Sequence, residues 1–275
     1  MPITNKVTRL TKGQITFFKT FGFIVLRKLF TEYEMGVIEE EHRIALATAF
    51  PDEPFSEKIG GQWTRMNDEN YPFYASLPED PRILTPAQQL CGDDVIGNGT
   101  DAHFAGGDTP WHTDGWEQEV NNKLEGIKYH FTLDQVTAKT GALRFIPGSH
   151  LLRGEKRTLF GKSIDDMPSE DVPSHPASTQ PGDIVVFDIR VWHASFGGAP
   201  DRRTSNIEYF SNPKTSQEET RLRDIGRLES NSRNANKYTF SKNWLHNPHA
   251  SSYRNRWIKR LTEIGYFNQP GVGEF

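Results

Sequence analysis

The chain has 275 residues, of which 25% are charged and 35% hydrophobic, and a formal net charge of −4. This length can bury a substantial core, and the ordinary balance of residue types argues against wholesale disorder. The charge gives no reason to expect nucleic acid as a partner, and the single cysteine, Cys91, excludes a disulfide framework and a cysteine-rich zinc site.

Apolar runs are short throughout the chain. The run FGFIVL at 21–26 falls far below the roughly 20 residues that a membrane-spanning helix needs. The opening MPITNKVTRLTKGQ lacks the apolar region of a secretory signal. We therefore expect a cytoplasmic protein without a membrane partner.

The first third of the chain indicates supporting helices. Thr11 with Gln14, and Thr31 with Glu34, form capping-box patterns that begin helices, and glycines follow two of the helical stretches. We predict a helix at 11–21, a strand at 23–30 (FIVLRKLF), a second helix at about 32–48, and a third within 78–93 that ends at Gly92.

The character of the sequence changes at about residue 94. Short apolar stretches separated by Gly, Pro, Asn and Asp predict strands of an all-β sandwich or barrel. These stretches are VIGNG, HFAGG, IKYHFTL, GALRFIPGSH, DIVVFDIRVWH and RTSNIEYFS. We predict a mainly β fold with flanking helices, built on a jelly-roll, double-stranded β-helix core.

We expect one domain, with helical support at about 1–93, the jelly-roll core at about 94–213 and a C-terminal basic extension at about 214–275. The polar segment 154–180 is predicted to be a long insertion or lid loop. The basic residues of 214–260 are interpreted as a solvated surface with helical ion pairs. The alternative is that they help to bind an anionic substrate or a partner subunit.

The motif WHTDG sets a histidine and an aspartate one residue apart. On an extended segment His112 and Asp114 point the same way, so both can contact one ion. His193, which follows a PGD turn and the apolar run IVVFDI, is the best third ligand. Two histidines and one carboxylate form the facial triad that binds non-haem Fe(II) and leaves positions open for a co-substrate and O2. An HxD pair alone is weak evidence, and the distant histidine strengthens it.

Two arginines follow His193 at the start of the stretch RRTSNIEYF. A guanidinium there can grip the far carboxylate of 2-oxoglutarate through two parallel hydrogen bonds. On a strand Arg202 shares a polar face with Thr204 and Asn206, and we prefer it for this reason. Arg203, which shares its face with Ser205, remains the alternative.

These motifs together resemble the phytanoyl-CoA dioxygenase family of Fe(II)/2-oxoglutarate oxygenases. The matching stretches occur in the family's order and are LTKGQITFFKTFGFIVLRKLF, DPRILTPAQQLCGDD, WHTDG, TGALRFIPGSH, QPGDIVVFD and WHAS followed by RRT. The resemblance implies that His112, Asp114 and His193 bind iron and that an arginine after the distal histidine binds 2-oxoglutarate.

The resemblance also implies roles for further residues. Ser195 matches a position that assists the co-substrate carboxylate, and His130 and Thr113 fall near 2-oxoglutarate in the family. Related halogenases carry Gly or Ala at the carboxylate position. Asp114 at that position therefore implies hydroxylation or another oxidation.

The remaining aromatic and polar residues near the motifs have both structural and functional interpretations. The candidates for contact with the substrate are Trp116, Arg144, Trp63, Arg65 and His103, and packing or surface roles are the alternatives for each. Trp111 is expected to pack and His150 to make a structural hydrogen bond. We expect His42, His175, His246 and His249 to be exposed.

The resulting hypothesis is a dioxygenase that uses Fe(II), 2-oxoglutarate and O2, with ascorbate as reductant. It would hydroxylate an unactivated C–H bond of a small, polar or natural-product-type metabolite and release succinate and CO2. The alternatives are desaturation, epoxidation or rearrangement by the same machinery, and a non-catalytic cupin-like metal-binding module. The expected partner is a small-molecule substrate, and the expected assembly is a monomer or homodimer.

Overall fold

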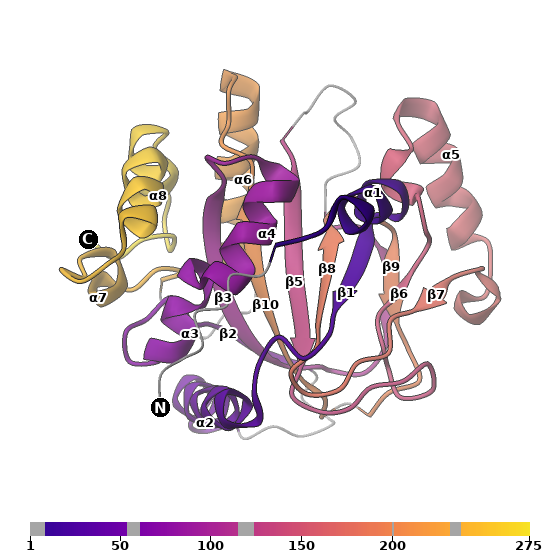
Figure 1. Cartoon of the computed structure of the whole chain (residues 1–275), viewed down its shortest axis with the longest axis horizontal. Helices are drawn as coiled ribbons and strands as arrows, with labels where there is room; N and C mark the ends of the chain where they lie inside the picture. Colours follow the sequence, from indigo (N-terminus) through magenta and orange to yellow (C-terminus); the bar gives the residue numbers. More distant parts are fainter. Residues whose placement is uncertain (1–8, 54–60, 115–123, 200, 232–237) are drawn as a thin grey trace.

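The structure, a computed structural model, describes residues 9–53, 61–114, 124–199, 201–231 and 238–275 (Figure 1). Its α-helices are α1 (Lys12–Phe21), α2 (Glu32–Ala49), α3 (Pro72–Ser76), α4 (Pro81–Cys91), α5 (Gly154–Asp165), α6 (Ser216–Asn231), α7 (Lys242–Leu245) and α8 (Ser252–Glu263). Its 3₁₀ helices are η1 (Leu77–Glu79), η2 (Ser149–Leu151), η3 (Ser169–Asp171) and η4 (Tyr266–Asn268). Its strands are β1 (Phe23–Leu26), β2 (Gln62–Arg65), β3 (Ile96–Phe104), β4 (Thr109–His112), β5 (Gly126–Thr132), β6 (Arg144–Phe145), β7 (His175–Pro176), β8 (Ile184–Asp188), β9 (His193–Ser195) and β10 (Arg203–Phe210).

The strands of the described residues form two antiparallel sheets. The large sheet has the order β1-β8-β5-β10-β3-β2 and the small sheet the order β4-β9-β6-β7. The two sheets meet where Phe23 of β1 stacks on Phe145 of β6, with ring centroids 4.6 Å apart. This arrangement is the predicted double-stranded β-helix. The strands β1 and β2, from the segment expected to be helical support, join the large sheet.

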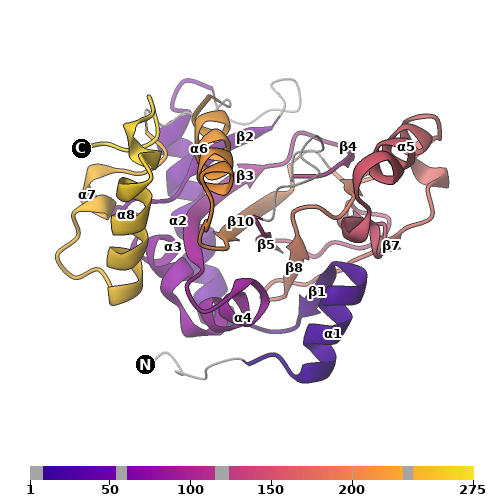
Figure 2. The ribbon, with the colours of Figure 1, turned by 90° about the horizontal axis from the view of Figure 1, so that it is seen from above.

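Helices α2, α3 and α4 cover the outer face of the large sheet (Figure 2). Side chains alternate between the two faces of a strand, and the outward set packs on these helices. Tyr129 of β5 donates a hydrogen bond to the carbonyl of Ile83 in α4 (2.9 Å), and the hydroxyls of Ser205 and Tyr74 lie 2.8 Å apart. The opposite, inner face is polar along β3, β5 and β10 and apolar along β1 and β8, where Phe23, Val185 and Phe187 pack with Phe145 of the small sheet.

The predicted helix starts are confirmed and the predicted strand at 23–30 is too long. Both capping boxes form, with Thr11 and Thr31 as the N-cap residues. The strand ends at Leu26 because Lys28 adopts a left-handed conformation (φ 51°) and its N–H donates to Asp183 (2.9 Å). Asp183 belongs to the PGD turn, so that turn also holds the end of β1.

The segment 154–180 was expected to be a loop, and this prediction is wrong. It contains α5 and η3, and Ile164 and Val172 are buried against Trp111, Trp192 and Ala194. Periodicity did not reveal the helix because charged residues surround the few apolar ones. The burial of those few side chains on the small sheet provides the stabilisation that the helix lacks by itself.

The basic C-terminal segment is not simply a solvated surface, which corrects the preferred interpretation. Arg254 of α8 is 3% exposed and forms ion pairs with Glu69 and Glu79, far away in the sequence. Arg260 pairs with Glu219 of α6 (2.7 Å). These ion pairs attach the C-terminal helices to the rest of the fold.

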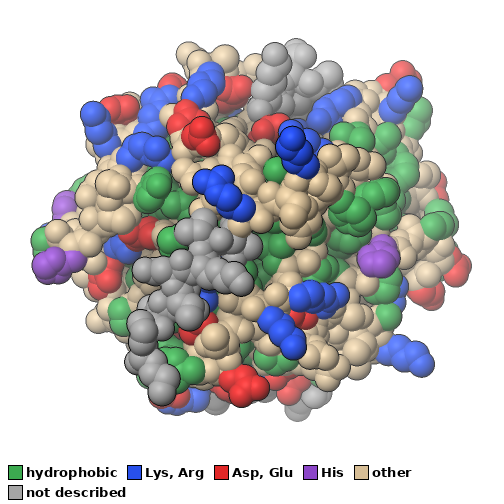
Figure 3. Space-filling model, in the orientation of Figure 1, with side chains coloured by type: hydrophobic (Ala, Val, Ile, Leu, Met, Phe, Trp, Pro, Cys, Tyr) green, Lys and Arg blue, Asp and Glu red, His purple; other side chains and the backbone are tan. Residues whose placement is uncertain are grey.

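Figure 3 shows basic and acidic side chains interspersed on the face that it presents. Among the helices that the structure describes, none combines the length and the apolar character that crossing a bilayer requires.

Glu34 links α2 to α4, and substitution of Glu34 tests how much this link stabilises the fold. Its carboxylate accepts two hydrogen bonds from Arg82 (2.7 and 3.1 Å) and caps its own helix, and the residue is 5% exposed. Glu34→Ala should lower the free energy of unfolding in urea by about 3 kcal/mol, because it leaves Arg82 buried with one partner fewer. Glu32→Ala, at an exposed position of the same helix, should change it by less than about 0.5 kcal/mol.

The effect of Glu34→Ala should also depend on pH. Burial acts to raise the pKa of Glu34, but the hydrogen bonds and charge of Arg82 outweigh it and the pKa is lowered. A carboxyl with a depressed folded-state pKa stabilises the protein above its unfolded pKa and loses this effect as the pH falls through the folded one. The gap between wild type and variant should therefore narrow on acidification, and a constant gap would contradict the assignment.

Candidate metal centre and adjoining cavities

The pairing of β4 with β9 places two histidines opposite each other. His112 is the register partner of His193, and their ring centroids are 4.2 Å apart. Asp114 follows β4, with its carboxylate oxygens 3.6 Å from Nε2 of His112 and 3.7 Å from Nε2 of His193. One ligand atom from each of the three residues lies within 4.8 Å of the others. The three residues predicted as a triad are thus brought together, and they could hold a metal ion.

Both imidazole rings are oriented by backbone carbonyls. Nδ1 of His112 lies 2.8 Å from the carbonyl of Pro110, and Nδ1 of His193 lies 3.0 Å from that of Val191. A carbonyl only accepts, so each Nδ1 carries a proton, and in the neutral ring Nε2 keeps a lone pair that a metal ion could bind. Partners of this kind fix the tautomer of metal-binding histidines in proteins.

Burial and charge favour the metal-binding protonation state at His193 and Asp114 and oppose it at His112. Burial lowers the pKa of His193 to about 4, so its ring is neutral. Burial also opposes ionisation of Asp114, but the charge of Lys128 outweighs it and holds the pKa of Asp114 well below its usual range. For His112 burial is outweighed by the hydrogen bond and charge of Asp114, which raise its pKa.

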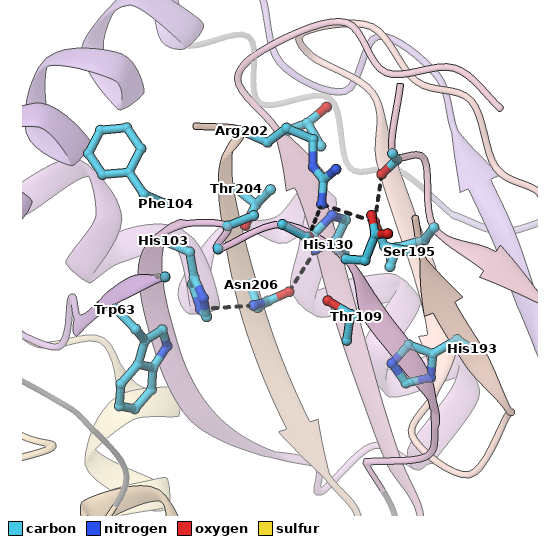
Figure 4. Close-up of a pocket in the computed structure, with 18 of the residues that line it drawn as sticks. Trp63, His103, Phe104, Thr109, His130, His193, Ser195, Arg202, Thr204 and Asn206 are labelled. Atoms are coloured by element: carbon cyan, nitrogen blue, oxygen red, sulfur yellow. Dashed lines mark hydrogen bonds between the residues drawn. The ribbon is translucent and has the colours of Figure 1, made fainter. Parts of the chain in front are cut away.

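The triad lines a cavity of about 400 Å³, which we call the triad cavity (Figure 4). Ser195 shares the inward face of β9 with His193, and His130 reaches the cavity from β5. Asn206 of β10 links the two neighbouring strands, because its Oδ1 lies 2.9 Å from His130 of β5 and its Nδ2 lies 3.3 Å from His103 of β3. Ser195, His130 and His103, all singled out in the sequence, therefore surround one space.

Arg202 enters the triad cavity through a gap left by two glycines. Its Nη2 donates to the Ser195 hydroxyl (3.1 Å) and to the carbonyl of Gly107 (2.9 Å). Its Nη1 is buried and has no hydrogen-bond partner among the described residues. A Cβ at Gly141 or Gly198 would lie 1.9 or 1.6 Å from that nitrogen. A buried cation with an unused donor in a cavity fits a carboxylate ligand.

Arg203 points elsewhere and is already paired. Its guanidinium forms ion pairs with Asp134 (2.6 Å) and with Glu39, outside the triad cavity. The geometry therefore favours Arg202 for contact with a carboxylate in the cavity.

A second cavity of about 520 Å³ adjoins the first, and we call it the charged cavity. The two share Trp63, His103, Asp114, Lys128 and Asn206 on their linings. The charged cavity adds Arg65, Asp101 and Glu208 from the sheet and Glu229 from α6. Trp63 and Arg65, predicted as candidates, thus line it together with His103.

Strand register brings the charged side chains of this cavity into contact. Glu208 of β10 is the register partner of Lys128 on β5, whose Nζ lies 3.0 Å from Glu208 and 3.0 Å from Asp114. Arg65 of β2, 2% exposed, lies 2.6 Å from Glu229. The chain of charges Glu229–Arg65–Glu208–Lys128–Asp114 therefore joins α6 to the triad.

Sequence reasoning missed Lys128, Asp101, Glu208 and Glu229. A signal for the strand residues was present, because charged and polar residues alternate with apolar ones in GIKYHFT and RTSNIEYF. This period of two predicts a polar inner face but not which strands are neighbours. Nothing local distinguishes Glu229 from the other acids of α6.

Three predicted site residues are not placed in the cavities. Thr113, between His112 and Asp114, faces the other way and accepts a hydrogen bond from Arg157 (3.2 Å). Arg144 pairs in register with Ala194, not with His193, so it lies on the outward face and stacks on Phe196 (4.6 Å). Trp116 lies outside the described residues.

The predictions for the other residues singled out in the sequence are partly confirmed and partly corrected. His150 lies 3.2 Å from the carbonyl of Lys19, and Trp111 packs in a cluster with Trp192, as expected. His42 was expected to be exposed and is 1% exposed, because its Nε2 lies 3.0 Å from the carbonyl of His103 and its helix packs on the sheet.

The carboxyl pair Glu208 and Glu229 should make stability fall with rising pH. The two groups share a hydrogen bond, and burial raises the pKa of Glu229 to about 8, against the charge of Arg65. An acid whose folded-state pKa is raised binds more protons when folded, so stability declines from about pH 5 to pH 8, by up to about 1.4 kcal/mol per pH unit. Urea unfolding of Glu229→Gln should show a flatter pH profile than wild type. Asp224→Asn on the same helix is the control, and equal slopes for wild type and Glu229→Gln would contradict this account.

Three solved structures illustrate what the chain is similar to. EctD from S. alaskensis with 2-oxoglutarate and 5-hydroxyectoine is 22% identical, with a TM-score of 0.58 over 74% of this chain and 77% of EctD. HygX from Streptomyces hygroscopicus with nickel and 2-oxoglutarate is 16% identical, with a TM-score of 0.61 over 74% and 88%. SnoK, a non-heme alpha-ketoglutarate-dependent carbocyclase from nogalamycin biosynthesis, is 20% identical, with a TM-score of 0.57 over 77% and 87%. At these identities the likeness establishes a shared fold.

A comparison with curated proteins finds no significant match. The model of the phytanoyl-CoA dioxygenase (PhyH) family matches residues 18–204, which is well over half of the chain and includes all three residues of the triad. The chain therefore belongs to the phytanoyl-CoA dioxygenase family, among the Fe/2-oxoglutarate-dependent oxygenases.

Proposed function

We propose that this protein is an Fe(II)- and 2-oxoglutarate-dependent dioxygenase that hydroxylates a C–H bond of a small polar metabolite. One observation carries the proposal. A single cavity contains the His112–Asp114–His193 triad and a buried guanidinium, Arg202, with an unused donor. A site that held metal only for stability would need the triad but not the guanidinium.

The residues present fit both groups. Two neutral imidazoles and one carboxylate are the ligand set of non-haem Fe(II) oxygenases, and they leave further metal positions open. The part of the triad cavity beside Arg202 and Ser195 suits the distal carboxylate of 2-oxoglutarate, for which guanidinium offers parallel hydrogen bonds. His130 would form a wall of the same space.

When bound, iron with 2-oxoglutarate and O2 supplies the oxidation of a C–H bond together with the release of succinate and CO2. The protein's part is orientation. His112, Asp114 and His193 would hold the metal, and Arg202 would fix the direction of the co-substrate. Lys128 keeps Asp114 ionised and in place through its 3.0 Å contact.

The primary substrate is proposed to bind in the charged cavity. This cavity borders Asp114, so a molecule there lies beside the metal position. Its volume of about 520 Å³ is within the range of small-ligand sites. Trp63 would contact an apolar part of the substrate, and Arg65, His103 and Glu229 polar groups. The lining also includes the apolar Ile189, Phe210, Ile225 and Leu228, so it suits a small metabolite with both polar and apolar groups.

The proposal can be tested by measuring succinate formation from 2-oxoglutarate under air, with added Fe(II) and ascorbate, against a panel of small polar metabolites. Chelator-sensitive succinate that rises with one panel member supports it. A product that gains one oxygen atom supports hydroxylation, whereas loss of two hydrogens or a rearranged skeleton supports the alternative outcomes. No turnover in iron-loaded protein would favour a metal-binding module without catalysis.

Removal of a triad ligand should abolish turnover coupled to the substrate. Asp114→Ala and His193→Ala each remove one of only three protein ligands, so succinate formation should fall to the level of the chelator control. His249→Ala removes an exposed histidine and should leave the rate unchanged. Normal activity in either triad variant would refute the ligand assignment.

The two arginines should differ in their effect on 2-oxoglutarate. Arg202→Ala should raise the 2-oxoglutarate concentration for half-maximal succinate formation by at least about tenfold, as expected for loss of a buried charged partner. Arg203→Ala should leave this concentration nearly unchanged and instead lower stability, because Asp134 and Glu39 lose their cation. The reverse order would show that Arg203 binds the co-substrate.

A further inference from the structure

The residues that precede the two histidines of the triad face away from the triad cavity and pack on α5. Trp111 comes directly before His112 and Trp192 directly before His193, and both lie in a buried cluster with Ile164 of α5. Strand alternation requires this, because neighbouring side chains point to opposite faces. Figure 2 shows α5 next to β4 on the side away from the large sheet. The helix therefore lies behind the triad.

Close packing holds α5 in this position. Trp111 donates its indole N–H to the carbonyl of Ser169 in η3 (3.1 Å). Gly161 of α5 lies so near Trp192 that a Cβ there would be 3.0 Å from the ring. The backbone N–H of Trp192 in turn donates to the hydroxyl of Ser149 (2.9 Å). The helix and both ligand-bearing strands thus form one tightly packed unit.

One guanidinium on α5 touches both segments that carry the triad. Arg157 is 8% exposed, and its Nη2 donates to the Thr113 hydroxyl (3.2 Å), between His112 and Asp114. Both Nη atoms of Arg157 donate to the carbonyl of Arg190 (3.1 and 3.2 Å), in the turn that leads to His193. Arg157 therefore joins the two segments from behind by hydrogen bonds, beside the apolar packing of Ile164 with Trp111 and Trp192.

We propose that Arg157 is a positioning residue that holds the His112–Asp114 segment and the His193 turn at the separation that a metal ion requires. This inference rests on the proposed metal role of the triad. The Nδ1 bonds orient each ring within its own segment, and the β4–β9 pairing sets the spacing at its end pair, His112 and His193. Thr113 and Arg190 lie beyond that pair, and Arg157 links the two segments there. A planar guanidinium with five donors in a rigid fork suits that task better than a flexible ammonium would.

The test is Co(II) binding to the metal-free full-length protein, followed by the visible d–d absorption of the bound ion. Arg157→Met should weaken the Kd for Co(II) about 10–100-fold, which is typical for partners that orient metal ligands, and should alter the d–d spectrum. Thr113→Val removes only one of the contacts and should weaken it about 2–10-fold. Thr113→Ser keeps the hydroxyl and should retain the wild-type Kd. Lys156→Met, at an exposed position of the same helix, should bind as wild type.

Several outcomes would overturn the inference. One is a Kd for Co(II) that stays within about twofold of the wild-type value in both Arg157→Met and Thr113→Val. Helix α5 would then contribute packing only, even if the Tm of the metal-free variants were lower. Equal weakening in Thr113→Val and Thr113→Ser would show that the hydroxyl has no part. If Arg157→Met does not fold, the Thr113 pair decides. The proposed metal site itself would be refuted if the wild-type protein bound no Co(II), or if His193→Ala bound Co(II) as tightly as the wild type.

Discussion

The in-register pairing of β4 with β9 is the constraint on which the site depends. It places His112 opposite His193, and it does so through backbone hydrogen bonds that no metal is needed to form. The same backbone supplies the carbonyls of Pro110 and Val191, which hold the rings with Nε2 facing inward. Because a shift by one residue would turn every side chain of a strand to the other face, this register decides whether a triad exists.

The large sheet meets a different demand, since its outer face is apolar whereas its inner face is charged along β3, β5 and β10. Tyr129 and Ser205 on the outer face reach hydrogen-bond partners in the helices that cover it. On the inner face the cost of burying Arg65 and Lys128 is offset by carboxylates from three separate elements. Ion pairs of this sort add little net stability but oppose any rearrangement that would leave a charge unpaired. The inner face is thereby a fixed polar surface against which a small molecule can be oriented.

The elements added to the core serve the site from outside it. Helix α6 carries Glu229 to the edge of the charged cavity, and α8 is fastened by Arg254 to acids in the first third of the chain. Helix α5 lies on the far side of the small sheet, with Arg157 against both ligand-bearing segments. The cavities are therefore open spaces inside a shell whose parts are fixed by long-range ion pairs and hydrogen bonds.

Local patterns in the sequence were enough to predict part of the fold and part of the candidate site. Capping boxes at Thr11 and Thr31 begin helices through contacts within four residues, and the alternation of HxD puts His112 and Asp114 on one side of a strand whatever the strand pairs with. The spacing of short apolar stretches predicted the fold, and the place of His193 after a PGD turn and an apolar run suggested it as the third ligand. Face alternation also separated Arg202 from Arg203, because neighbours on a strand must diverge.

What the tertiary structure decided are the contacts between segments far apart in the chain. The register of β6 with β9 turned Arg144 away from the cavity, and the pairing of β5 with β10 brought Lys128 to Glu208. Helix α5 is stabilised by the packing of Ile164 with Trp111 and Trp192. The polar sequence of the helix gives no sign of these contacts. Periodicity states which way a side chain points, but it contains no information on which strand or helix will lie opposite. That choice is made by the packing of the whole chain.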